Sequence, residues 1–202
     1  MLKHKQIRRK LRFKMYLLKA LTIVAISLLS TSQVLAENTR HYLEFDIAGM
    51  DAKAKDNAGV VGYDSGMNGF FVKYGYDINN WLAIEGHIGN SGESDDDAPT
   101  YTIKASAIGF LGGRFNLRYD GFTLYGLAGA ANVALTETES GTEYKTTYSS
   151  IAYGLGMDLY GSKESAITFS VVRYLDVTEG TLTTAQIGFK FYFDKPKFSG
   201  RY

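Results

Sequence analysis

The stretch AQIGFKFYF, residues 185–193, decides the fold of this chain. Its apolar side chains occupy every second position, Ile187, Phe189, Phe191 and Phe193, with Gln186, Gly188 and Lys190 standing between most of them. Because successive side chains of a β-strand point to opposite faces, this spacing gives one apolar face and one polar face. A helix would distribute the same residues around its circumference. The stretch therefore predicts a β-strand with one face in an apolar environment.

The same alternation recurs upstream in seven segments separated by polar or glycine-containing breaks: residues 42–50, 69–77, 81–89, 101–115, 123–135, 150–160 and 166–175. Eight is the smallest even number of strands that closes a transmembrane barrel. Long connections at 52–66, 90–100, 136–147 and 176–183 alternate with short ones near 77–80, 117–121 and 161–165, as in outer-membrane barrels. We therefore predict an all-β fold, an eight-stranded antiparallel up-and-down transmembrane β-barrel.

One face of the predicted barrel is apolar and aromatic, and we assign it to lipid because a soluble barrel would turn its bulky apolar side chains inward. In two segments this assignment directs the following residues outward: Ile103, Ala105, Ala107, Leu111 and Phe115 in 101–115, and Tyr125, Leu127, Ala131, Val133 and Leu135 in 123–135. In 166–175 it also directs Arg173 outward. There, Arg173 either reaches a lipid phosphate at the rim or is turned inward by a β-bulge.

The other face carries charges of both signs, which would meet in a narrow lumen: Glu44, Asp46, Lys73, Glu85, Lys104, Arg114 and Lys190. Buried ions must be paired or hydrogen-bonded, since an unpaired buried charge is costly. We interpret the set as an internal ion-pair network. A gated ion path, in which the network opens transiently, is the functional alternative.

The N-terminal residues 1–36 have the composition of a secretory signal peptide. An apolar run at 20–29 follows Lys19 and precedes Val34-Leu35-Ala36, a small-residue cleavage pattern. This run is too short for a membrane helix of about 20 residues. We predict cleavage between Ala36 and Glu37, a barrel over 37–193 and a short tail over 194–202, with Met15 as an alternative start of translation.

Composition narrows the class of protein further. Of the 22 Lys and Arg residues, eight lie in residues 1–36, so the predicted mature chain has 14 basic against 21 acidic residues, a net charge of −7. A nucleic-acid partner therefore lacks an electrostatic basis. The chain has no Cys, which excludes disulfides and thiolate metal sites. The 166 residues after position 36 fit one domain.

Catalytic and metal-binding candidates are few. The predicted mature chain contains only His41 and His87, and although His87 and Glu85 share a strand face, no third member of a triad stands at a useful spacing. The acidic loop at 92–97 has four carboxylates but no Ca²⁺-loop spacing, so we interpret it as a solvated loop. We predict no catalytic residues, no cofactor and no metal site.

Several strings resemble the small outer-membrane barrel family that includes OmpX, Ail and Lom, and more distantly the transmembrane part of OmpA: NGFFVKYGY at 68–76 with Trp81, LYGLAGAA at 124–131, AYGLG at 152–156 and the closing segment 188–193. Gln186, Gly188, Phe191 and Phe193 resemble the terminal targeting signal of such barrels, although here nine residues follow Phe193.

The resemblance implies a monomer in the outer membrane of a Gram-negative cell. Its expected partners are outer-membrane lipid and lipopolysaccharide, the barrel-assembly machinery and an extracellular ligand of the loops. We expect a structural or surface-interaction role through acidic extracellular loops. A small pore, as proposed for the OmpA barrel, is the first alternative, and an outer-membrane enzyme is the second.

Overall fold

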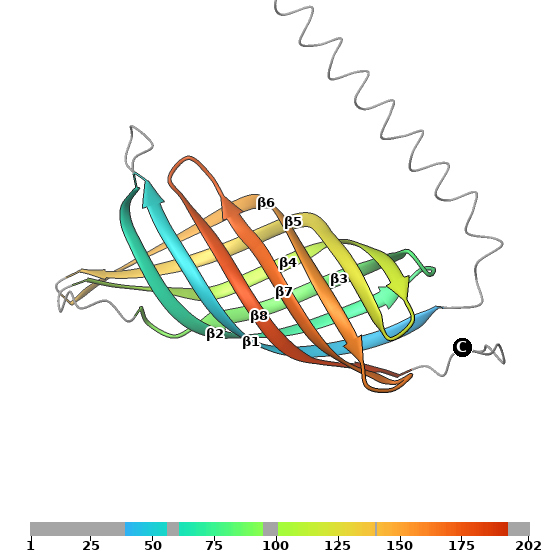
Figure 1. Ribbon diagram of the computed structural model, residues 1–202. Coiled ribbons are helices and arrows are strands. Elements are labelled where there is room, and N and C mark those ends of the chain that lie inside the picture. The colour runs from blue at the N-terminus through green and yellow to red at the C-terminus, as the bar shows by residue number, and fades with distance from the viewer. Residues whose placement is uncertain (1–38, 56–60, 95–100, 140, 194–202) are drawn as a thin grey trace, which may run out of the picture. The chain divides into compact units, whose positions relative to one another are not determined.

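The computed structural model describes residues 39–55, 61–94, 101–139 and 141–193 (Figure 1). The predicted signal peptide, its cleavage site between Ala36 and Glu37, and the tail at 194–202 lie outside the described residues. The described chain forms these strands: β1 (Arg40–Lys55), β2 (Val61–Asp77), β3 (Leu82–Ser91), β4 (Tyr101–Tyr119), β5 (Phe122–Glu139), β6 (Thr142–Tyr160), β7 (Ser165–Asp176) and β8 (Gly180–Tyr192). Within these residues, no helix is long and apolar enough to cross a membrane.

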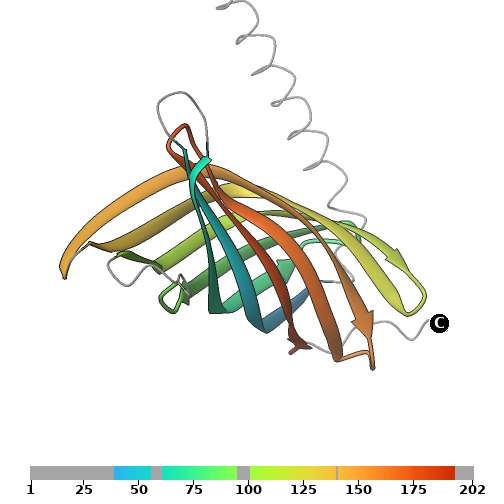
Figure 2. The ribbon, with the colours of Figure 1, turned by 60° about the vertical axis from the view of Figure 1, so that its left-hand side comes forward.

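The eight strands close into one barrel in sequence order, and each strand pairs antiparallel with its neighbours (Figures 1 and 2). Closure joins β1 to β8, where Phe45 faces Phe189 and Glu44 faces Lys190. The predicted fold class is therefore confirmed. Closure also leaves no unpaired sheet edge in the hydrocarbon region, which a membrane requires.

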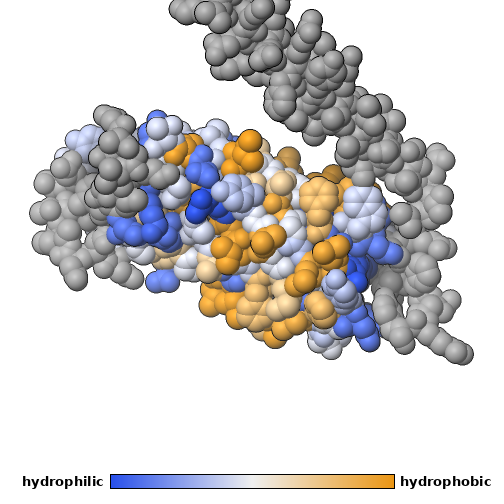
Figure 3. Space-filling view, turned by 45° about the horizontal axis from the view of Figure 1, so that its top comes forward, coloured by the Kyte–Doolittle hydropathy of each residue, from blue (hydrophilic) through white to orange (hydrophobic). Residues whose placement is uncertain are grey.

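The outer face is apolar on most strands, as the alternation predicts. Ile47 on β1, Ile88 on β3 and Leu155 on β6 are 66%, 76% and 72% exposed on this surface. Figure 3 shows hydrophobic residues gathered across the barrel wall that faces the viewer. Side chains at these positions contact lipid in a membrane, so their exposure to the surroundings is favourable there.

The predicted facing of β5 was wrong. Tyr125, Leu127 and Val133 are buried inside the barrel, as are Ala131 and Leu135, while Leu124 points outward. The bulky side chains fill the lumen instead of contacting lipid. Alternation fixes which residues share a face, but in this strand neither face carries a charge that would mark the inside.

The predicted facing of β4 was wrong only in its first part. The register of β4 against β5 shifts between Ala105 and Ala107, which marks a β-bulge at Ser106. A bulge inserts one unpaired residue and so reverses the inside-outside alternation. Ile103 and Ala105 are consequently buried, whereas Leu111 and Phe115 point outward as predicted.

Three of the four predicted long loops are mostly strand instead: in 52–66, residues 52–55 belong to β1 and residues 61–66 to β2. β5 ends at Glu139 and β6 begins at Thr142, so most of 136–147 belongs to one long hairpin, and only residues 177–179 separate β7 from β8. Gly141 has φ +85°, a left-handed conformation that suits glycine in a hairpin turn. The connections that follow β2, β4 and β6 are short, as predicted.

Arg173 stays on the outer side of β7. The irregularity lies one residue later, between Arg173 and Leu175, so that Tyr174 is fully buried while the Arg173 side chain is 39% exposed. Arg173 Nε donates to Thr183 Oγ1 at 3.2 Å, and Nη1 lies 3.7 Å from Asp176 Oδ2. Of the two alternatives for Arg173, the structure therefore shows the outward position at the rim and not the inward position.

Candidate functional site

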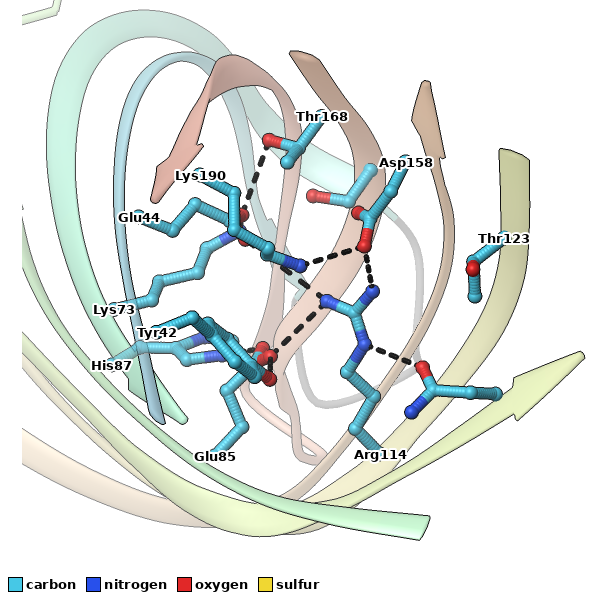
Figure 4. A network of polar contacts seen from close by, with 12 residues as sticks. Tyr42, Glu44, Lys73, Glu85, His87, Arg114, Thr123, Asp158, Thr168 and Lys190 are labelled. Atoms are coloured by element: carbon cyan, nitrogen blue, oxygen red, sulfur yellow. Dashed lines mark hydrogen bonds and ion pairs between the residues drawn. The ribbon is translucent and has the colours of Figure 1, made fainter. Parts of the chain in front are cut away.

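The lumen holds a cluster of charged side chains, which we call the ionic layer (Figure 4). Its members come from six strands and none is more than 2% exposed: Glu44, Asp46, Lys73, Glu85, Arg114, Asp158 and Lys190. They meet because each occupies an inward position on its strand at a similar height along the barrel. The layer has four carboxylates and three permanent cations, so its charges nearly balance.

Two lysines join β1 to its neighbours. Lys73 Nζ on β2 lies 2.7 Å from Glu44 Oε1 and 3.0 Å from Asp46 Oδ2. Lys190 Nζ on β8 lies 2.9 Å from Glu44 Oε2 and 2.9 Å from Asp158 Oδ2. Thr168 on β7 donates its hydroxyl to Asp46 Oδ1 at 3.0 Å. The two lysines therefore link four strands through direct ion pairs.

Arg114 on β4 crosses the lumen. Its Nη1 lies 3.2 Å from Glu85 Oε2, its Nη2 donates to Asp158, and its Nε donates to Asn116 Oδ1 at 2.8 Å. The guanidinium carbon lies 3.5 Å from the centre of the Tyr125 ring, within the range of a cation–π interaction. Tyr125 thus occupies an inward position on β5, as Leu127 and Val133 do on the same strand.

His87 on β3 connects the ionic layer to the rest of the interior. Its Nε2 lies 2.6 Å from Glu85 Oε1, and its Nδ1 lies 2.6 Å from the Tyr174 hydroxyl. Its ring centroid is 4.4 Å from that of Phe110. Both ring nitrogens are thus engaged by side chains of the barrel, and His87 itself is only 1% exposed.

Beyond His87 the lumen is filled with apolar side chains, which we call the apolar layer. The rings of Phe71 and Tyr174 stack with centroids 5.2 Å apart and an interplanar angle of 11°. Among its other buried members are Met50, Met67, Ile108, Phe110, Leu127, Val133, Val172 and Leu182. Each of these side chains is at most 5% exposed.

A smaller polar cluster lies at the end of the barrel that holds Arg40 and Tyr192, which we call the terminal end. Arg118 Nη2 lies 2.7 Å from Asp77 Oδ2, and Arg40 Nη2 lies 3.6 Å from the same oxygen. The Arg40 guanidinium also lies 4.0 Å from the centre of the Tyr192 ring. This cluster was not predicted from the sequence.

The structure places six of the seven predicted network residues in the ionic layer. Lys104 is the exception and is a correction: its side chain is one third exposed and its nearest ion-pair partner is Glu93, at 3.9 Å. The bulge at Ser106 lies between Lys104 and Arg114 and reverses the inside-outside alternation, so the two side chains point to opposite faces of β4. Asp158 was not among the predicted network residues, although it shares the inward positions of Gly154 and Gly156 in the alternation of its strand.

The opposite end of the barrel, which we call the distal end, carries an extended sheet. Figure 1 shows β4, β5 and β6 reaching beyond the other strands there, and β4 pairs with β5 as far as Tyr101↔Glu139. The ladder between β5 and β6 is continuous from Phe122↔Leu159 to Glu139↔Thr142, but β6 pairs with β7 only from Tyr153 to Tyr160. Within the described part of the chain, residues 142–149 of β6 therefore have a strand partner on one edge only.

No group of three or more His, Cys, Asp or Glu residues in the described ranges could hold a metal ion. The acidic loop at 92–97 is described only as far as Ser94, and Asp95, Asp96 and Asp97 lie outside the described residues.

Residues 21–193 match the family model described as the outer membrane protein beta-barrel domain. The chain belongs to this family of outer-membrane β-barrel proteins, and its location is the cell outer membrane. A search among curated protein sequences finds no match.

Three solved structures are similar to this chain. Ail, the attachment invasion locus protein of Yersinia pestis, is 20% identical with a TM-score of 0.58 over 78% of this chain and 99% of Ail. Neisserial surface protein A is 12% identical with a TM-score of 0.59, over 76% and 97% of the two chains. The N-terminal barrel of Pseudomonas aeruginosa OprF is 15% identical with a TM-score of 0.50, over 74% and 97%. At these identities the likeness concerns the fold.

Outer-membrane barrels have short periplasmic turns and longer extracellular connections. The connections after β2, β4 and β6 lie at the terminal end, where β1 begins and β8 ends, and the distal connections after β5 and β7 are equally short. Because the β5–β6 hairpin extends the distal end (Figure 1), we infer that this end faces the outside of the cell and that the terminal end faces the periplasm.

Proposed function

We propose that this protein is a closed, non-conducting barrel that acts at the cell surface through the sheet at its distal end. The proposal rests on one combination of features: the lumen is occupied by buried side chains, and the sheet at the distal end has a strand edge without a partner. An ion would have to cross both layers of the lumen, whereas a partner can reach the sheet directly.

Two features of the lumen support closure. In the ionic layer each carboxylate has a cation or a hydroxyl within 3.2 Å, so opening a path requires separating buried ion pairs. In the apolar layer, the buried polar side chains of Ser170, Thr184 and Gln186 are hydrogen-bonded to one another or to Tyr174, so an ion would lose its hydration shell among apolar side chains and polar groups that are already engaged. A lumen lined by charged side chains along its whole length would lack the barrier that the apolar layer provides.

Exposure and charge support the sheet as an interaction surface. Tyr144 on β6 is 56% exposed, and the side chains of Glu143 and Lys145 beside it are 54% and 74% exposed. The described distal residues include Glu93, Glu137, Glu143, Asp176 and Glu179. A structure of Ail holds the heparin analogue sucrose octasulfate. For the present chain, these carboxylates disfavour a polyanion, so we expect a ligand of different chemistry.

A pore and an enzyme remain the alternatives. The pore would use the ionic layer as a gate, as a network of exchangeable ion pairs allows. The enzyme would use His87 with Glu85, but both nitrogens of His87 are engaged inside a packed interior, out of reach of a substrate. We therefore propose a protein without catalytic activity.

We also propose that residues 1–36 direct secretion and are removed, and that the barrel-assembly machinery inserts the remainder as a monomer surrounded by lipid and lipopolysaccharide. Gln186, Gly188, Phe191 and Phe193 are the proposed assembly signal. Phe193 N donates to His41 O at 3.0 Å, so the pairing of this segment with β1 continues one residue beyond β8.

The surface role is tested by shortening the hairpin. Leu135 and Thr146 are cross-strand partners and form a hydrogen-bonded pair, so replacing residues 136–145 by Asn-Gly joins them through a two-residue turn without changing the register. Cells that produce this variant should attach to surfaces and to one another less than cells with an equal amount of the wild-type protein. A heat-dependent shift in gel migration would verify that the variant is folded. Equal attachment of the two would contradict the surface role.

A further inference from the structure

The unpaired edge of β6 at residues 142–149 is a strand edge without a bulge. Its ladder with β5 has no register shift, and residues 142–147 are all exposed. Protein surfaces usually protect such an edge, because its free N–H and C=O groups can pair with another strand. The edge is therefore open to a strand from outside.

The direction of its free backbone groups follows from the hairpin. Glu139 and Thr142 flank a two-residue connection and so form its hydrogen-bonded closing pair. Hydrogen-bonded and non-hydrogen-bonded pairs alternate along an antiparallel ladder. Glu143, Lys145 and Thr147 consequently direct their N–H and C=O groups away from β5, towards the open edge.

The side chains on this edge are complementary to themselves in one register. The sequence Thr142-Glu143-Tyr144-Lys145-Thr146 reads as polar, acidic, aromatic, basic, polar. In an antiparallel pair of two copies centred on Tyr144, Glu143 of each copy stands opposite Lys145 of the other. Both positions direct backbone groups outward, so each Glu–Lys pair is also a hydrogen-bonded pair.

The two registers next to this one oppose like charges. A pair centred on Glu143 sets two glutamates opposite each other, and a pair centred on Lys145 sets two lysines opposite each other. Like charges directly opposite one another destabilise a sheet, whereas opposite charges stabilise it. In the monomer, Glu143 Oε2 and Lys145 Nζ lie 3.8 Å apart as an exposed pair, so little is lost when they exchange partners.

We propose that the open edge of β6 binds the same edge of a second copy of this chain, centred on Tyr144. This inference rests on the proposed surface role and names its partner. In every copy β6 runs from the distal end towards the terminal end, and antiparallel strands run in opposite directions. The two barrels therefore point their distal ends at each other, so they lie in facing membranes. Each contact is short, and many copies acting together give the adhesion its strength.

The charges allow a sharp test with purified protein in lipid vesicles. Vesicles carrying the wild type should cluster, as measured by light scattering. Glu143→Lys places lysine at both positions and Lys145→Glu places glutamate at both, so vesicles of either single variant should associate about tenfold more weakly. The double exchange Glu143→Lys with Lys145→Glu restores complementarity within one protein and should restore clustering.

A mixture of the two single variants gives the decisive measurement. Vesicles of Glu143→Lys mixed with vesicles of Lys145→Glu should cluster with each other, because lysines of one then face glutamates of the other. Lys104→Glu makes the same charge change on β4 and should cluster like the wild type. Single variants that cluster as well as the wild type, or a mixture that does not cluster, would overturn the homotypic pair.

The two proposals fail in different ways. If the vesicles never cluster but shortening the hairpin still reduces attachment of cells, the partner is not a second copy and the surface role stands. If shortening the hairpin changes nothing and the vesicles do not cluster, both proposals fall.

Discussion

Lys190 Nζ on β8 lies 2.9 Å from Asp158 Oδ2 on β6, although β7 stands between the two strands. Both side chains are fully buried. A contact that passes over a neighbouring strand ties the wall together across the lumen, in addition to the backbone ladders. The ionic layer therefore contributes to the stability of the barrel and, in our proposal, to its closure.

The replacement Lys190→Met should lower the free energy of unfolding by about 3 kcal/mol, because it leaves Glu44 and Asp158 partly uncompensated in the interior. Urea unfolding in lipid vesicles measures this. Lys145→Met, at an exposed site, is the matched control and should change stability by less than about 1 kcal/mol. Equal losses of stability from the two replacements would show that the buried ion pairs of Lys190 contribute no more than an exposed lysine does.

Arg114 and Asp158 should be coupled. A double-mutant cycle with Arg114→Gln and Asp158→Asn should give an interaction energy of about 1–3 kcal/mol, the range for residues within one hydrogen-bonded network. The same cycle on Lys53 and Asp64, whose pair at 2.8 Å is exposed to solvent, should give less than about 1 kcal/mol. A coupling near zero for the buried pair would be inconsistent with the geometry of the ionic layer.

The packing of the apolar layer can be tested where the backbones of β4 and β5 approach each other closely. Gly112 and Gly129 face each other on β4 and β5, and a Cβ at Gly129 would lie 2.4 Å from Leu111 O and 2.7 Å from Phe110 Cε2. Gly129→Ala should therefore cost about 1–3 kcal/mol through overpacking.

Gly126→Ala is the control for that replacement. At Gly126, on the same strand, the nearest atom to an added Cβ is Leu155 Cδ2 at 3.8 Å, an ordinary contact. Unfolding measurements should place this variant within about 0.5 kcal/mol of the wild type. If Gly129→Ala is tolerated as well, the close approach of β4 and β5 is wrong.

The assembly signal makes a prediction in cells. Phe193→Ala with Phe191→Ala should reduce the amount of heat-modifiable protein in outer-membrane fractions, because the closing strand then lacks its aromatic signal residues. Deleting residues 194–202 should leave that amount unchanged if the signal works from Phe193. Loss of assembly after the deletion alone would move the signal into the tail.

The strand count and the facing of β1 and β8 could be predicted because charges such as Glu44 and Lys190 mark one face and phenylalanines mark the other. The facing of β5 could not, because Tyr125 and Leu127 alternate with glycine and alanine, and a lumen lined by apolar side chains reverses the usual assignment. Lys104 was misplaced because a bulge at Ser106 leaves no mark in the alternation. Asp158 could have been found, since it follows Gly154 and Gly156 on the inward positions of β6.

In our proposal, the ionic layer and the apolar layer together close the lumen. Recordings of ionic current across a planar lipid bilayer test this most directly. The protein is first shown to be folded by its heat-dependent gel shift, and protein-free membranes serve as the reference. Wild-type protein should give no current above that reference. Discrete conductance steps that appear with the folded protein would contradict closure and favour the pore.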